Sequence, residues 1–303
     1  MKKEQATPLV SITCISFNHE QFIEQCLNGW LMQITNFPFE VVLYDDASTD
    51  RTGSVIQEYA NRFPNIFNII LSEENQYSRG VRGINAKFNL PRCRGKYIAL
   101  CEGDDYWTDP YKLQKQVDFL EKNTDFTICW TNYDELKNNV LFKPSWDKDF
   151  FESDFFEVNL NNFSTPYCTL TLTALFRASC IKIVPFERMR HSKDNTVYAA
   201  CLSEGNGAVL NFKSSVYRIH DKGVYSMNAV HKNTKANFLN IVEILFFFPK
   251  TRNGHFKFLF NHFRKQAKSQ TTILDYFSVW VKIFRIAAKS KSPKTLTFLL
   301  SRK

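Results

Sequence analysis

The chain has 303 residues and 44% hydrophobic content, enough for one large domain or two ordinary ones. Its eight cysteines include no CxxC pair, and several lie inside apolar runs, so we expect reduced core thiols in a cytosolic protein and exclude a disulfide framework and a zinc site. The first residues lack an apolar secretory segment, and the longest apolar stretch, Leu239 to Pro249, is too short to span a bilayer.

The net charge of +9 is unevenly distributed. Residues 231–303 carry 15 lysines and arginines against two acidic residues, whereas residues 1–230 carry a net charge of −4. This shift predicts a boundary near residue 230. We expect a catalytic domain over 1–230, with one half at about 1–107 and the other at about 108–230, followed by a basic, aromatic-rich helical region over 231–303.

The first hundred residues alternate between strand and helix patterns. Apolar, β-rich runs predict strands at 9–15, 39–44, 67–71 and 97–100. Helical spacing and cap residues predict helices at 18–33, 51–63 and 83–92. This alternation predicts an α/β fold with a mainly parallel sheet flanked by helices.

Polar residues follow three of these strands at their carboxyl ends, where such sheets bind ligands. They are Ser16-Phe17-Asn18, Asp45-Asp46 and the run from Glu102 to Asp105. The last run holds three carboxylates in four residues, which repel one another unless a cation is present. Carboxylate oxygens are hard ligands that suit Mg²⁺ or Mn²⁺. A solvated acidic turn is the alternative interpretation.

A nucleotide would have to bind without the usual glycine-rich loops, because neither GxGxxG nor GxxxxGK[ST] occurs. Phe17 could stack on a base, or it could be a core aromatic residue. Asp46 could accept a hydrogen bond from a base or a ribose. Asp45 could do so too, or it could lie at a helix N-terminus.

Three stretches together resemble the family 2 glycosyltransferases of the GT-A fold: VSITCISFNHEQFIEQCLNGWLMQ, FEVVLYDDASTDRT and GKYIALCEGDDYW. The resemblance covers roughly residues 8 to 228. It implies a nucleotide-diphospho-sugar donor, often UDP-linked, and a divalent cation. The donor-binding residues that it implies are Ile15, Phe17, Asn18, Asp46, Lys87 and Asp104, and the implied metal-binding residues are Asp104, Asp105 and His220.

The acidic motif departs from the family pattern at its first position, where Glu102 replaces the usual aspartate. Whether Glu102 binds the metal therefore stays open. Tyr106 and Trp107 follow the motif and are expected to stack on a sugar face or to pack beneath the acceptor region. Lys87 is expected at the diphosphate, with a solvated helix lysine as the alternative.

The second half is expected to bind the acceptor. A strand region is predicted over 164–176 and a helix over 195–203. Asp194 matches the acidic residue that precedes this helix in the family, which implies that it is the general base. A helix N-cap is the competing interpretation.

The resemblance implies an inverting transfer of a sugar to a hydroxyl group of a glycan or lipid-linked acceptor, in cell-surface polysaccharide synthesis. Two rivals are a metal-dependent sugar nucleotidyltransferase and a non-catalytic protein that binds glycan or nucleic acid. The basic tail contains no nucleic-acid-binding motif, so we expect no nucleic-acid partner.

The basic tail contains two aromatic-rich stretches with helical spacing, at 256–268 and 271–291. In the second, Ile273, Phe277, Trp280, Val281 and Phe284 are predicted on one face, opposite the polar residues. Such a helix either packs on the catalytic domain or lies on an anionic membrane. The second outcome would place the protein at the cytoplasmic face of the plasma membrane.

Overall fold

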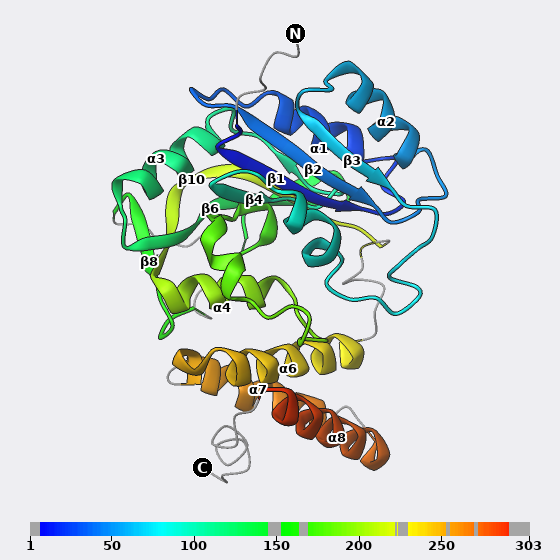
Figure 1. The fold of residues 1–303 in the computed structure, drawn as a ribbon, viewed down its shortest axis with the longest axis vertical. Helices are drawn as coiled ribbons and strands as arrows, with labels where there is room; N and C mark the ends of the chain where they lie inside the picture. The colour runs from blue at the N-terminus through cyan, green and yellow to red at the C-terminus, as the bar shows by residue number, and fades with distance from the viewer. Residues whose placement is uncertain are drawn as a thin grey trace.

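One mixed sheet lies at the centre of the computed structural model, which describes residues 7–144, 153–163, 169–221, 223, 230–252, 255–269 and 272–290. The strand order is β3-β2-β1-β4-β9-β6-β10-β5, with β7 beside β6 and β8 beside β10. Helices α1, α2 and α3 cover one face of the sheet and α4 covers the other (Figure 1). The predicted α/β sheet flanked by helices is confirmed.

The first four strands are parallel, as predicted. They are β1 (Val10–Ser16), β2 (Phe39–Asp45), β3 (Phe67–Leu71) and β4 (Tyr97–Leu100). The intervening helices are α1 (Ile23–Leu31) and α2 (Thr52–Arg62). Helix α1 begins later than predicted because Asn18 has a left-handed φ of 55°, which an α-helix does not accommodate.

The predicted helix over 83–92 is confirmed, although it is irregular. A π-helical turn, η1 (Asn85–Asn89), runs into a 3₁₀ turn, η2 (Leu90–Arg92). Pro91 lacks a backbone donor and cannot continue a helix ladder. The Asn89 side chain also donates to the Cys14 carbonyl oxygen at 2.8 Å, which fixes this turn against β1.

The second half mixes strand directions, because β9 runs antiparallel to both β4 and β6. Its strands are β5 (Tyr106–Trp107), β6 (Phe126–Lys137), β7 (Val140–Phe142), β8 (Phe155–Val158), β9 (Leu175–Arg177) and β10 (Asn206–Ile219). Its helices are α3 (Lys112–Lys122), η3 (Thr171–Thr173), η4 (Ala178–Ile183) and α4 (Asp194–Glu204). Of the strand predicted over 164–176, residues 164–168 lie outside the described residues, and β9 begins only at Leu175.

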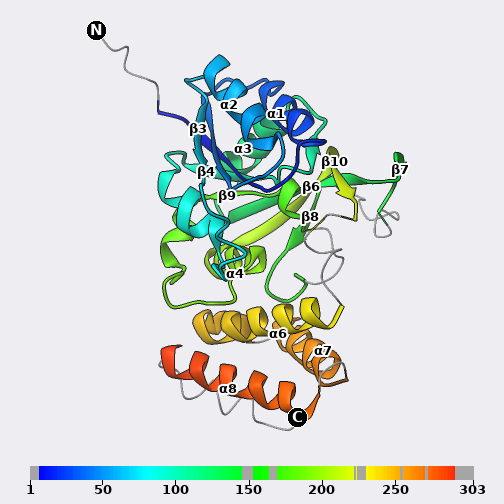
Figure 2. The same ribbon diagram turned by 90° about the vertical axis from the view of Figure 1, so that its right-hand side faces the viewer.

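The predicted helical C-terminal region is confirmed. It consists of α6 (Val230–Phe247), η5 (Pro249–Arg252), α7 (His255–Ser269) and α8 (Ile273–Ser290). Figure 2 shows α6 below α4, with α8 on the side of α6 away from the sheet. Buried residues of α4 and α6 belong to one apolar cluster that extends to β6 and β10. None of the described helices is both long and apolar enough to cross a bilayer.

Helix α8 has two apolar sides. Val279, Ile283 and Ile286 are buried in the cluster shared with α6. On the other side Phe277 and Phe284 are exposed, although the sequence placed them on one face with partly buried Trp280. The helix therefore packs on the domain and also presents aromatic side chains to solvent.

The seven cysteines within the described residues are free, and six of them are buried. This agrees with the expected reduced core thiols.

Candidate functional site

The carboxyl ends of β1, β2 and β4 meet at one edge of the sheet. Ser16 ends β1, and its hydroxyl donates to Asp45 Oδ1 at the end of β2, at 2.7 Å. The backbone N–H of Gly103, just after β4, donates to the Ile15 carbonyl oxygen. The three polar groups that the sequence singled out therefore lie together, as the parallel topology requires.

The two aspartates after β2 shape this edge. Asp45 accepts hydrogen bonds from the Ser48 N–H and hydroxyl at 2.9 and 2.6 Å, so it holds the turn that leads to α2. Asp46 accepts the N–H groups of Gln76 and Tyr77 at 2.7 and 3.0 Å. Asp46 thus anchors the segment that follows β3, and its contact with a nucleotide base stays a prediction.

The segment after β1 presents an aromatic ring to solvent. Phe17 is 42% exposed, so the alternative of a core aromatic residue is wrong. Asn18 keeps the segment in place, because its N–H donates to Ser48 Oγ and its side-chain oxygen accepts the Thr49 N–H. The exposed ring of Phe17 fits the predicted stacking on a base.

The acidic motif places its three carboxylates in different surroundings. Glu102 accepts a 2.6 Å hydrogen bond from Thr171 Oγ1, and burial followed by the charge of Asp194 raises its pKa to about 8. Asp105 is 2% exposed and accepts the Arg218 N–H at 2.8 Å. Burial and the neighbouring Asp104 raise the pKa of Asp105 well above its usual value.

Asp104 lies between two histidines. Its Oδ2 atom is 3.1 Å from His220 Nε2 and 3.8 Å from His19 Nε2. Burial acts to raise the pKa of Asp104, but the hydrogen bond from His220 and the charge of His19 outweigh it, so the pKa is lowered. Asp104 is therefore the carboxylate of the motif that is held ionised, which suits a cation ligand.

Arg218 links the acidic motif to α1, and sequence reasoning did not single it out. Its Nε atom donates to the Asp104 carbonyl oxygen and its Nη2 atom to Gln25 Oε1, both at 2.8 Å. Its guanidinium lies 5.0 Å from the centre of the half-buried Tyr106 ring. The sequence could have pointed to Arg218, because it lies two residues before His220.

Trp107 is a core residue, so the prediction that it contacts a sugar is wrong. Its side chain is 2% exposed, and its indole N–H donates to the Leu172 carbonyl oxygen at 2.8 Å. The buried ammonium of Lys112 lies 4.2 Å from the ring centre. Trp107 packs in the core instead, and whether the region above it binds the acceptor stays a prediction.

Lys87 projects from η1 and is exposed, so its contact with a diphosphate stays a prediction. Asn85 and Asn89 on the same turn face inward: Asn85 donates to Thr13 Oγ1, and Asn89 is fully buried. These two amides bind η1 to β1 and leave Lys87 directed outward.

Asp194 is the first residue of α4, and Lys193 is the N-cap. The capping interaction runs from the Lys193 N–H to Thr196 Oγ1 at 3.1 Å, so the interpretation of Asp194 as the cap is wrong. Asp194 is an exposed residue, yet desolvation of its carboxyl raises its pKa, while Lys193 opposes the shift. Its charge acts on Glu102 across the site.

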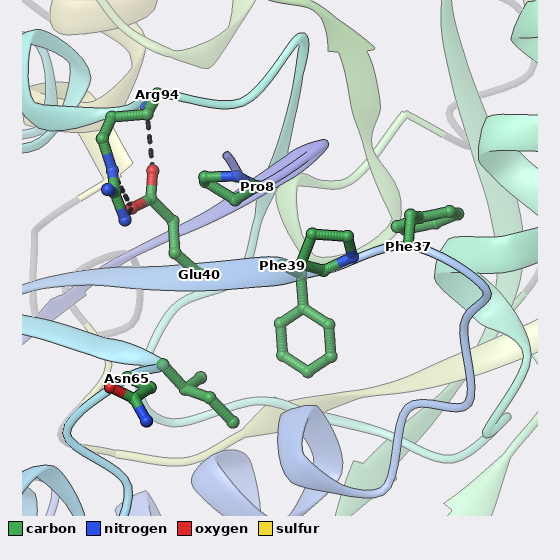
Figure 3. Close-up of a pocket in the computed structure, with 8 residues that line it drawn as sticks. Pro8, Phe37, Phe39, Glu40, Asn65 and Arg94 are labelled. Carbon is green, nitrogen blue, oxygen red and sulfur yellow. Dashed lines mark hydrogen bonds and ion pairs between the residues drawn. The ribbon is translucent and has the colours of Figure 1, made fainter. Parts of the chain in front are cut away.

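A separate cavity of about 280 Å³ lies at the opposite edge of the sheet (Figure 3). Pro8, Phe37 and Phe39 contribute to its mainly apolar lining. Glu40 and Arg94 form an ion pair at 2.7 Å, so its charged groups are already satisfied. We do not assign the reactive site to this cavity.

Residues 11–184 match the family model "Glycosyl transferase family 2". An uncharacterised protein of Mycobacterium tuberculosis is 44% identical over 147 residues, which cover 46% of this chain and 41% of that protein. The chain thus spans about two fifths of that relative's length. The Escherichia coli UDP-Glc:alpha-D-GlcNAc-diphosphoundecaprenol beta-1,3-glucosyltransferase WfaP is 25% identical over 78% of this chain and 87% of its own.

Solved structures share the fold. Staphylococcus aureus TarS, in complex with UDP-GlcNAc, superposes with a TM-score of 0.63 over 91% of this chain and 81% of its own, at 18% identity. The Pyrobaculum calidifontis mannosyltransferase PcManGT, in complex with GDP-Man and Mn²⁺, gives a TM-score of 0.55 over 98% of this chain and 87% of its own, at 13% identity. Since the family model covers more than half of the sequence, the chain belongs to glycosyl transferase family 2 and has its GT-A fold.

Proposed function

We propose that this protein transfers a sugar, with inversion, from a UDP-sugar to a hydroxyl group of a glycan or lipid-linked acceptor in the synthesis of a cell-surface polysaccharide. The observation that carries the proposal is the acidic motif at the carboxyl edge of the parallel strands, where Asp104 Oδ2 lies 3.1 Å from His220 Nε2 and the ring of Phe17 is exposed. Sheets of this kind bind ligands at this edge.

The donor side offers a place for a divalent cation. Asp104 and His220 would hold it, since a cation could replace the proton that joins Asp104 Oδ2 to His220 Nε2, and a donor diphosphate would complete the shell. Within the described residues no cluster of three metal-binding side chains is preformed. Asp105 fits less well, because it is buried and holds the Arg218 N–H. The cation would supply positive charge to the departing diphosphate.

The acceptor side offers a proton acceptor. Asp194 is exposed at the first position of α4, where its carboxylate can be reached by an acceptor. Its raised pKa brings it nearer to neutrality, where a general base is most effective. Asp194 would take the proton of the acceptor hydroxyl as that oxygen attacks the anomeric carbon. Glu102, held by Thr171, would stay protonated near neutral pH and limit the negative charge around the donor.

The substitution Asp194→Asn tests this assignment. It should lower kcat by roughly 10²–10⁴-fold, while UDP affinity by titration calorimetry with Mn²⁺ stays near the wild-type value. Glu204→Gln, at the exposed far end of the same helix, is the matched control and should keep kcat. An Asp194→Asn enzyme within a few-fold of wild-type turnover would remove Asp194 from the mechanism.

We also infer that α8 lies on an anionic membrane surface, at the cytoplasmic face where a lipid-linked acceptor would be met. Leu274, Phe277 and Phe284 are 81%, 69% and 50% exposed, and basic residues on the same helix include Arg285 and Lys289. Exposed aromatic side chains flanked by positive charge suit the interface of an anionic bilayer.

Liposome co-sedimentation tests this surface. The triple variant Leu274→Ser, Phe277→Ser, Phe284→Ser should stay in the supernatant under conditions where wild-type protein sediments with anionic vesicles at low salt. Val140→Ser with Leu141→Ser, which changes equally exposed apolar residues on β7, is the control and should still sediment. Equal sedimentation of both variants would contradict a role for α8.

A further inference from the structure

Helix α6 carries three polar residues on the side that faces the segment before α4. They are Asn237, Asn240 and Glu243, spaced three residues apart, so they share one side of the helix. The surrounding residues of α6 are mostly buried and apolar. Polar residues at such positions are costly unless their hydrogen bonds are satisfied.

Two of these residues, Glu243 and Asn237, bind the segment before α4. Glu243 accepts the backbone N–H groups of Arg190 at 2.7 Å and of His191 at 2.8 Å, one on each carboxylate oxygen. Asn237 accepts a 2.7 Å hydrogen bond from Lys193 Nζ. The three residues contacted, Arg190, His191 and Lys193, all lie within four residues before Asp194.

Asn240 acts on the first turn of α4 from the other side of Asp194. Its amide donates to Thr196 Oγ1 at 2.8 Å, and the same Thr196 oxygen accepts the Lys193 N–H that caps the helix. Asn240 therefore orients the capping hydroxyl. Asp194 lies between residues that α6 holds on both sides, and it is itself exposed.

We infer that Asn240 and Glu243 are positioning residues that hold the segment 190–196, and with it the backbone of Asp194, in place. The inference rests on the proposed role of Asp194 as general base. A displacement of about 1 Å in a catalytic group costs on the order of 10²-fold in rate, so the register of this segment matters for turnover. Glu243 is 1% exposed and Asn240 is fully buried, and neither reaches the reacting atoms.

The test compares Glu243→Gln, Glu243→Leu and Asn240→Leu in the full chain. Turnover is measured as UDP released from UDP-glucose and from UDP-N-acetylglucosamine in the presence of Mn²⁺. We expect kcat to fall about 10- to 100-fold for Glu243→Leu and Asn240→Leu, with the KM for the donor within about threefold. Glu243→Gln keeps one acceptor oxygen, so it should retain more activity than Glu243→Leu.

Ile241→Ala on α6 is the matched control, because it removes buried apolar volume and lowers the melting temperature without touching the hydrogen bonds to residues 190–196. It should keep kcat. A second readout is amide hydrogen exchange in the peptide over 188–198, which should become faster in the Glu243 and Asn240 variants and stay unchanged in the control.

Two results would overturn the inference: kcat within twofold of wild type in both leucine variants, or unchanged exchange over 188–198. Wild-type protein that releases no UDP from either donor would refute the proposed function instead. Hydrogen exchange would then still decide whether α6 holds this segment, because that measurement needs no substrate.

Discussion

The buried carboxyl of Glu243 predicts a specific dependence of stability on pH. Burial raises its pKa from 4.5 to about 7, and the N–H groups of Arg190 and His191 only partly oppose the shift. The folded state therefore binds this proton more tightly than the unfolded state does. The resulting contribution to the free energy of unfolding is complete below about pH 4.5 and is lost as the pH rises through about 7.

The size of the effect follows from the two pKa values. Since one pKa unit corresponds to about 1.4 kcal/mol, the full shift is worth about 3 kcal/mol, of which about 2.5 kcal/mol is lost between about pH 5 and about pH 8. Glu243→Gln cannot titrate. The free energy of unfolding of wild type minus that of Glu243→Gln should therefore fall by about 2.5 kcal/mol over this pH range.

Urea unfolding followed by circular dichroism at both pH values measures this difference. Subtracting the variant cancels the other titrating groups, to the extent that they do not contact Glu243. Ile241→Ala is the control: it removes buried apolar volume but no titrating group, so the free energy of unfolding of wild type minus that of Ile241→Ala should not depend on pH. The reasoning would be refuted if the free energy of unfolding of wild type minus that of Glu243→Gln changed by less than about 1 kcal/mol over this range, or if it rose with pH.

Two further predictions concern the donor side. Trp107→Phe should lower the free energy of unfolding by about 2 kcal/mol, because it removes a buried hydrogen bond and leaves a cavity. The affinity for UDP, measured by calorimetry, should stay unchanged. A selective loss of affinity for the sugar would show instead that Trp107 contacts the substrate. Asp104→Asn should abolish the dependence of UDP affinity on Mn²⁺ while the melting temperature stays within a few degrees of wild type, and an unchanged Mn²⁺ dependence would place the cation elsewhere.

The sequence was sufficient to predict that the polar groups of the candidate site gather at one edge of the sheet. Alternating strands and helices require parallel strands, and parallel strands bring Ser16, Asp45 and Glu102 to the same edge whatever the details of packing. The same reasoning could not assign Trp107. Burial of a residue just after the motif depends on α1 and α3, which approach it from distant parts of the chain.

The contacts that tune the acidic motif were beyond sequence reasoning for a related reason. Thr171 bonds Glu102 from 69 residues away, and Arg218 bonds Asp105 from 113 residues away. No local period or motif spacing encodes such pairs. Arg218 lies two residues before His220, which the family resemblance did mark, so attention to the neighbours of that residue would have found it.

The change of charge near residue 230 predicted a boundary, and that division stays a prediction, but the two sides share buried polar contacts. Asn240 and Glu243 from the basic side satisfy a hydroxyl and two backbone N–H groups beside Asp194. Removing residues 231–303 would take these hydrogen bonds away from the two N–H groups and the hydroxyl, and it would expose the apolar cluster that α4 shares with α6. The distribution of surface charge reflects how a protein meets solvent and binding partners. Whether two parts of a chain unfold together depends on the buried contacts between them. We therefore expect the C-terminal helices and the acceptor half to unfold together.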